Sequence, residues 1–244
     1  MLGVHQGAAP PCSERPWTQS LAFRLAVFSL CLAAWGCGEP FSEAPVGRAA
    51  GDDPGAVRTT LRARIHPDLP PYSFTLRGKP PDASGGVYRV ERIEVRRGDA
   101  PEPVQVIEGL ATQTPVSADA PGLEVLDMNF DEYGDLRIVE FPPAGPNVPY
   151  LNWLFDPVSA RFLRSPEFDA IASPVLDAST RRIRSAWRDS ATRYGTDVYS
   201  VVDGKPVLVR KELKEYSKPG AYRWTVSERV GDDWKTVEQK LVRE

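Results

Sequence analysis

Hydrophobic and polar residues alternate with a period of two through most of the chain after residue 57. Because successive side chains of a β-strand point to opposite faces of a sheet, this alternation predicts strands. Turn-forming residues separate the alternating runs at intervals of roughly 8–12 residues. The predicted strands are Val57–Ile65, Tyr72–Leu76, Val87–Val95, Val104–Ile107, Leu123–Met128, Leu136–Phe141, Tyr150–Phe155, Arg161–Leu163, Arg182–Trp187, Asp197–Val202, Pro206–Lys211, Tyr222–Val230 and Trp234–Val242.

Turn signals between these runs define the fold class. Asp203-Gly204 separates two apolar runs, and this dipeptide supplies the positive φ angles of a tight hairpin turn. Only 166–173 indicates a helical turn. Many short strands with tight turns predict an all-β fold, a compact antiparallel domain that is either propeller-like or a sandwich.

The first 36 residues have the organisation of an export signal. Arg15 and Arg24 precede an apolar run that extends from Leu25 to Trp35, about 11 residues. Spanning a bilayer takes roughly 20 residues, so this run is too short for a permanent membrane anchor. Residues 1–36 are therefore predicted to be a cleaved signal peptide.

Cys37 follows residues that resemble the lipidation site of bacterial lipoproteins. Cys12 and Cys31 leave with the signal, so the mature chain keeps one cysteine and can form no internal disulfide. Acyl chains on that thiol would hold the protein in a membrane; the alternative is ordinary signal-peptidase cleavage nearby, which leaves a free thiol. Gly38 stands where lipoproteins retained in the inner membrane have Asp, so the resemblance implies an outer-membrane lipoprotein facing the periplasm.

The remaining chain divides into a linker and a domain. Residues 37–56 are small, acidic and rich in Pro and Gly, which predicts a flexible tether. Residues 57–244 are predicted to form a single all-β domain.

Overall composition narrows the function classes. Lys and Arg number 30 against 33 Asp and Glu, a net charge of -3, which does not favour nucleic-acid binding. His66 is the one histidine after the export signal. One histidine is too few for a zinc site built from histidines, and it gives little basis for Ser-His catalysis. The chain also has no Walker-type phosphate loop and no Gly-x-Ser-x-Gly elbow. We therefore expect a binding protein, not an enzyme.

The segment 127–135 carries oxygen ligands at alternate positions. Ca²⁺ takes 6–8 hard oxygen ligands, and a tightly wrapped loop directs alternate side chains at one centre. Four side chains and the carbonyl of the tyrosine would supply these oxygens. The candidate ligands are Asp127, Asn129, Asp131, Tyr133 and Asp135.

This segment differs from an EF-hand loop, which has Gly at its sixth position and Glu at its twelfth. Glu132 and Ile138 stand there instead, and the flanking segments are predicted strands. The sequence thus predicts a strand-loop-strand calcium loop. The alternative is an Asx-rich hairpin whose carboxylates cap backbone amides in water, because repulsion among exposed acids is screened by salt.

Five blocks, in order along the chain, resemble a family of bacterial envelope lipoproteins. The family includes immunity proteins that block peptidoglycan glycohydrolases delivered by type IV secretion, and it is similar to periplasmic inhibitors of invertebrate-type lysozyme. The resemblance spans roughly 87–215 and implies a propeller-like fold, a calcium loop at 127–135, and inhibition by occlusion of a hydrolase active site. The blocks are Leu126–Ile138, Tyr150–Phe162, Ser165–Asp169, Arg182–Ser185 and Tyr199–Val209.

Arginines gather after Ser179, opposed nearby only by Asp189. They predict a solvated sheet face; the functional alternative is a cationic surface, or an arginine that pairs with the catalytic carboxylates of a glycosidase. The arginines are Arg181, Arg182, Arg184, Arg188 and Arg193.

Other candidate residues have a structural and a functional interpretation. Trp153, Trp187, Trp224 and Trp234 are expected to pack in the core or at its edge, with a sugar-stacking platform as the alternative. Glu167 and Asp169 could serve a glycosidase, although a chain with 33 acids offers many such pairs.

These expectations combine into one functional hypothesis. The chain is expected to be a monomeric, calcium-stabilised envelope lipoprotein that inhibits a peptidoglycan hydrolase. The competing hypothesis is a structural or carbohydrate-binding envelope lipoprotein without inhibitory activity.

Overall fold

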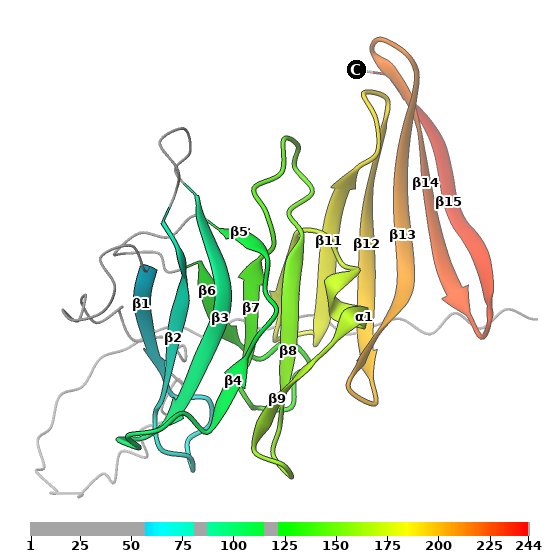
Figure 1. Ribbon diagram of the computed structural model, residues 1–244. Helices are drawn as coiled ribbons and strands as arrows, with labels where there is room; N and C mark the ends of the chain where they lie inside the picture. The colour runs from blue at the N-terminus through cyan, green and yellow to red at the C-terminus, as the bar shows by residue number, and fades with distance from the viewer. Residues whose placement is uncertain (1–56, 81–86, 115–121, 244) are drawn as a thin grey trace, which may run out of the picture. The chain divides into compact units, whose positions relative to one another are not determined.

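The computed structural model describes residues 57–80, 87–114 and 122–243 (Figure 1). Within them the chain forms three antiparallel sheets and one short helix, which confirms the predicted all-β fold class. The predicted signal peptide (1–36) and the tether with Cys37 (37–56) lie outside the described residues. In the described part, no helix has the length and apolar character needed to cross a bilayer.

The first sheet has the order β1-β2-β3-β4, with β5 also paired to β3. The alternate apolar residues Phe74 and Leu76 of β2 and Ile93 and Val95 of β3 are buried, as the period-two pattern predicts, and the polar residues Thr75 and Glu94 between them are buried as well. β5 was not predicted, because its buried residues are threonines and give no apolar alternation. The strands are β1 (Val57–Ala63), β2 (Tyr72–Lys79), β3 (Tyr88–Arg97), β4 (Gln105–Ile107) and β5 (Thr112–Thr114).

The second sheet has the order β6-β7-β8-β9 and packs against the first through aromatic rings. Phe74 of β2 and Phe162 of β9 meet edge to face, with 5.5 Å between ring centroids. Helix α1 (Pro166–Asp169) follows this sheet, inside the predicted helical turn. The strands are β6 (Leu123–Leu126), β7 (Asp135–Val139), β8 (Tyr150–Asp156) and β9 (Arg161–Arg164).

The third sheet runs in sequence order from β10 to β15, each strand paired with the next. The predicted turn at Asp203-Gly204 joins β12 to β13 with φ of 49° and 73°, which confirms the hairpin. β10 was not predicted, and β12 and β13 are longer than predicted. The strands are β10 (Pro174–Asp177), β11 (Arg182–Arg188), β12 (Arg193–Val202), β13 (Lys205–Lys218), β14 (Ala221–Val230) and β15 (Asp233–Arg243).

The last strand, β15, forms one edge of the third sheet and is exposed along nearly its whole length. Its pairing with β14 shifts register next to Val237, and it carries Lys235 and Lys240. Bulges and lysines on edge strands disfavour pairing with another chain. These features are compatible with a monomer.

Glu94 of β3 is held by three arginines. Its side chain is 9% exposed and accepts from Arg77 Nε at 3.1 Å and Arg96 at 3.1 Å, with Arg92 at 3.4 Å. Burial alone would raise the pKa of Glu94, but hydrogen bonds and charges from Arg77 and Arg96 outweigh it and lower the pKa below its usual range. The ionised form therefore stabilises the fold.

Replacement of Glu94 by Gln is expected to lower the free energy of unfolding by about 1–3 kcal/mol, because charge-assisted hydrogen bonds are lost. Because the pKa of Glu94 is lower in the folded than in the unfolded protein, its ionised carboxylate stabilises the fold above about pH 4.5. This stabilisation is lost as the pH falls through the pKa of the folded state. Chemical denaturation between about pH 3 and 7 should show this acid dependence weakened in Glu94→Gln. The control Glu91→Gln, at an exposed pair with Lys79, should behave like the unmodified protein.

Candidate functional site

The predicted metal loop joins β6 to β7, so it lies between two strands as expected. Its apolar residues Met128 and Phe130 are buried in a second core cluster with Phe168 of the α1 segment and Ile183 of β11. Its polar residues alternate with them. The loop is therefore anchored by its apolar side chains, which leaves Asp127, Asn129 and Asp131 on the other side.

Three of the predicted ligands gather around the amide of Asp131. This N–H donates to Oδ1 of Asp127 at 3.0 Å and to Oδ1 of Asn129 at 3.2 Å. The amides of Glu132 and Tyr133 donate to Asp127 and Asp131 at 2.9 Å each, and Asn129 Nδ2 donates to Asp131 Oδ2 at 2.8 Å. The turn thus brings oxygens of three side chains together and satisfies its own backbone amides.

Asp135 has a different environment. It is fully buried at the start of β7; its Oδ2 accepts from the amide of Met128 at 2.9 Å and its Oδ1 accepts from the amide of Phe155 at 2.8 Å. It therefore fastens the loop to β8. The spacing in the sequence makes Asp135 a candidate metal ligand. In the structure, each of its two carboxylate oxygens accepts a hydrogen bond from a backbone N–H.

Without a cation, burial and mutual repulsion disfavour the ionised forms of two carboxylates in this loop, Asp127 and Asp135. Burial, with a smaller contribution from the charges of Asp131 and Asp127, raises the pKa of Asp135 to about 8, against the lowering effect of the Phe155 and Met128 amides. Burial also raises the pKa of Asp127, against its backbone hydrogen bonds, and the charge of Asp131 adds to the rise. A bound divalent cation would offset this repulsion and favour the ionised forms.

The donor set fits a hard cation only if neutral oxygens take part. In the described part of the chain, no three His, Cys, Asp or Glu side chains meet at one centre. A calcium ion would draw on Asp127 and Asp131, the amide oxygen of Asn129 and the carbonyl of Tyr133. Its chemistry there would be charge neutralisation and stabilisation of the loop.

The ring of Tyr133 connects the loop to the β1–β2 connection and to β8. It stacks on His66 with 4.4 Å between centroids and on Phe155 with 5.5 Å. Gly134 next to it donates its N–H to the carbonyl of Ile65 at 2.7 Å. No local pattern in the sequence indicates this stack, because residues 66 and 133 are distant in sequence.

The arginine group is divided between the two faces of the third sheet. Cross-strand pairing places Arg182, Arg184 and Arg188 on one face, whereas Arg193 lies on the other, with Asp189 at 2.9 Å. Arg181, in the turn before β11, lies 5.9 Å from the ring of Phe130. The five arginines therefore form no single patch.

The predicted tryptophans and acids have identifiable contacts. Trp153 is buried in the core, and Trp187 lies against Gly195; Trp224 and Trp234 are more exposed on the third sheet. Asp169 accepts from Asn152 and from Arg164, and Glu167 pairs with Lys205. Both acids thus make structural contacts.

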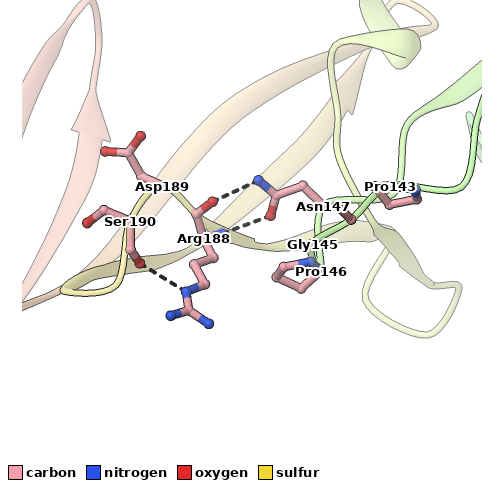
Figure 2. Close-up of a pocket in the computed structure, with 8 residues that line it drawn as sticks. Pro143, Gly145, Pro146, Asn147, Arg188, Asp189 and Ser190 are labelled. Carbon is pink, nitrogen blue, oxygen red and sulfur yellow. Dashed lines mark hydrogen bonds between the residues drawn. The ribbon is translucent and has the colours of Figure 1, made fainter.

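An open cleft of about 480 Å³ lies between the β7–β8 loop and the β11–β12 turn (Figure 2). Asn147 ties its two sides together, since it accepts from the amide of Arg188 at 2.9 Å and donates to the Arg188 carbonyl at 2.8 Å. Figure 2 shows the Arg188 guanidinium extending away from Asn147 to the carbonyl of Ser190, 2.9 Å from Nε. No pattern in the sequence indicates this cleft.

Comparisons with known proteins add a fold relationship. No protein-family model matches the chain, and no curated protein matches its sequence. A solved structure described as a Xanthomonas type IV secretion system related protein is similar, with a TM-score of 0.59 and 13% sequence identity. The match covers 82% of this chain and 100% of that chain. The chain therefore shares its fold with a protein related to type IV secretion.

Proposed function

We propose that this protein is a cell-envelope lipoprotein that binds a peptidoglycan hydrolase of the lysozyme-like class and occludes its active site. The observation that carries this proposal is the fold shared with a type IV secretion related protein over the whole of that chain. The resemblance to immunity lipoproteins over roughly 87–215 supports the same assignment. Lipidation of Cys37 would moor the domain at the outer membrane, where such an enzyme acts.

Packing of the domain suits inhibition by occlusion. Two core clusters hold the sheets, and hydrogen bonds fix the exposed turns, such as the pair between Asn147 and Arg188. A fixed surface loses little conformational entropy when it binds, which favours tight association. The partner would be blocked by steric exclusion, and no group of this chain would need to react.

A structural calcium ion in the loop is part of the proposal. Asp127, Asn129, Asp131 and the carbonyl of Tyr133 would hold it, and Asp135 would anchor the loop to β8 beneath it. The support is the convergence of the Asp127 and Asn129 side chains on the Asp131 amide, the contact of Asn129 with the Asp131 carboxylate, and the raised pKa values of Asp127 and Asp135.

Added Ca²⁺ is expected to raise the melting temperature of the protein. At about a hundred times the dissociation constant, ligand linkage contributes about 2.7 kcal/mol, or about 5–10 °C for a domain of this size. Differential scanning fluorimetry of Asp131→Ala should show no such shift. Glu132→Ala, an exposed neighbour outside the ligand set, should keep it; a shift retained in Asp131→Ala would contradict the site.

Co-precipitation separates the proposed function from a structural or carbohydrate-binding role. The immobilised protein is expected to retain lysozyme-like glycohydrolases in a complex of fixed stoichiometry. Binding to purified sacculi without retention of any such hydrolase would contradict the proposal. Release of soluble fragments from peptidoglycan by the protein alone would contradict it equally, because it would show an enzyme.

A further inference from the structure

One row of side chains crosses the third sheet from β11 to β15, five neighbouring strands in Figure 1. Each member is the cross-strand partner of the next, so all five project from the same face. Cations and aromatic rings alternate along the row. The members, in order, are Arg188, Tyr194, Lys214, Trp224 and Lys240.

On β11, the face that carries this row is open to solvent. Ala186 and Arg184 on the same face of β11 are exposed, whereas Ile183 and Ser185 on the opposite face are buried. Arg188, Lys214 and Lys240 are exposed and the two rings are half-buried. The charged members of the row are therefore accessible, whereas Val226, beside the row on the same face of β14, is buried.

Positive charge dominates the row. It contains no acid, and within the described residues Arg188 and Lys214 have no ion pair, whereas Lys240 pairs with Glu238 at 3.2 Å. The cations rest on rings: Arg188 lies 5.0 Å from the Tyr194 centroid and Lys240 lies 4.1 Å from that of Trp224. A cation therefore covers one face of each ring, and a ligand would contact the remaining surface of the rings together with the neighbouring cations.

Spacing along the row restricts the ligand. The cations stand on alternate strands, so they are about 9–10 Å apart, twice the distance between neighbouring strands. In an extended acidic peptide, side chains on the same face are two residues apart, which is about 7 Å along the strand. This spacing does not match the interval of about 9–10 Å between the cations. A glycan chain with one carboxylate per disaccharide has a comparable repeat, and its sugar rings present apolar faces.

We propose that this face binds an extended anionic glycan laid across the strands. Sugar rings would stack on Tyr194 and Trp224, and carboxylates would pair with Arg188, Lys214 and Lys240. The site is independent of hydrolase inhibition. It would hold the protein on a carboxylate-bearing polysaccharide of the envelope.

Isothermal titration of the full chain with hyaluronan oligosaccharides, which carry one carboxylate per disaccharide, tests this proposal. Lys214→Gln and Trp224→Ala are each expected to weaken binding about tenfold, the loss of one charge-assisted contact or one stacked ring. The matched control is Lys211→Gln. Lys211 lies on the same strand and rests on Trp234 at 4.0 Å, but it projects from the opposite face; its replacement should leave binding within about twofold.

Three results would overturn the proposal. Absence of binding would remove the site, and equal weakening by Lys211→Gln would show attraction by overall charge only. Polyglutamate that binds as tightly as hyaluronan would show a surface for acidic polypeptides. Neutral chitin oligosaccharides are expected to bind at least about tenfold more weakly, since they leave the three cations unpaired.

Discussion

In the presence of chelator, Asp135→Ala is expected to unfold with a free energy about 3–5 kcal/mol below that of the unmodified protein. The variant leaves two buried amides, those of Met128 and Phe155, without an acceptor and detaches the loop from β8. Urea denaturation followed by tryptophan fluorescence measures this loss. Chelator ensures that it reflects hydrogen bonds and not a lost cation.

A matched control is available at Asp156. Its carboxylate also accepts from two backbone amides, those of Val158 and Ser159, but in an exposed turn. Water replaces such bonds when they are lost, so Asp156→Ala should be much milder than Asp135→Ala. Asp135→Asn should fall between them, because an amide keeps one acceptor oxygen but turns a donor toward the second N–H. Equal effects of the alanine variants would contradict the anchoring role of Asp135.

Gly195→Ala is expected to lower the free energy of unfolding by about 1–3 kcal/mol. A Cβ atom at this position of β12 would lie 2.1 Å from Cζ2 and 2.3 Å from Cε2 of the Trp187 indole, which covers the glycine from β11. The rigid ring must move to admit a methyl group. Thermal or urea denaturation measures the loss.

A double-mutant cycle identifies the cause. If the clash with the indole is responsible, Gly195→Ala should be far less damaging in a Trp187→Ala background, because the ring is gone. Gly145→Ala, where a Cβ would meet nothing within 4 Å, serves as the neutral control. Additive effects of the Gly195 and Trp187 replacements would contradict the steric explanation.

Local patterns in the sequence were sufficient to predict most strands and their turns. The alternation in β2 and β3 and the Asp203-Gly204 turn are visible within a few residues, and each acts through short-range geometry. β5 and β10 carry too little apolar alternation. The outer parts of β12 and β13 are polar on both faces, and cross-strand pairs such as Tyr194 with Lys214 hold them, which a single-strand pattern cannot reveal.

The candidate loop was located by spacing, but the roles within it were not. Asp127 and Asp135 occur at equivalent alternate positions, yet Asp127 caps its own turn and Asp135 points to the amide of Phe155 in another strand. Which acid is buried depends on how β8 packs, and that contact is distant in sequence. The stack of His66 on Tyr133 escaped prediction for the same reason.

Occlusion of a hydrolase active site is tested most directly by titrating the purified protein against lysozyme-like glycohydrolases and measuring the release of soluble fragments from peptidoglycan. A tight occluding inhibitor predicts that activity falls linearly with added protein and vanishes near one equivalent, with no cleavage of the inhibitor. Full activity at about tenfold molar excess, for invertebrate-type lysozyme and for glycohydrolases delivered by type IV secretion alike, would contradict it.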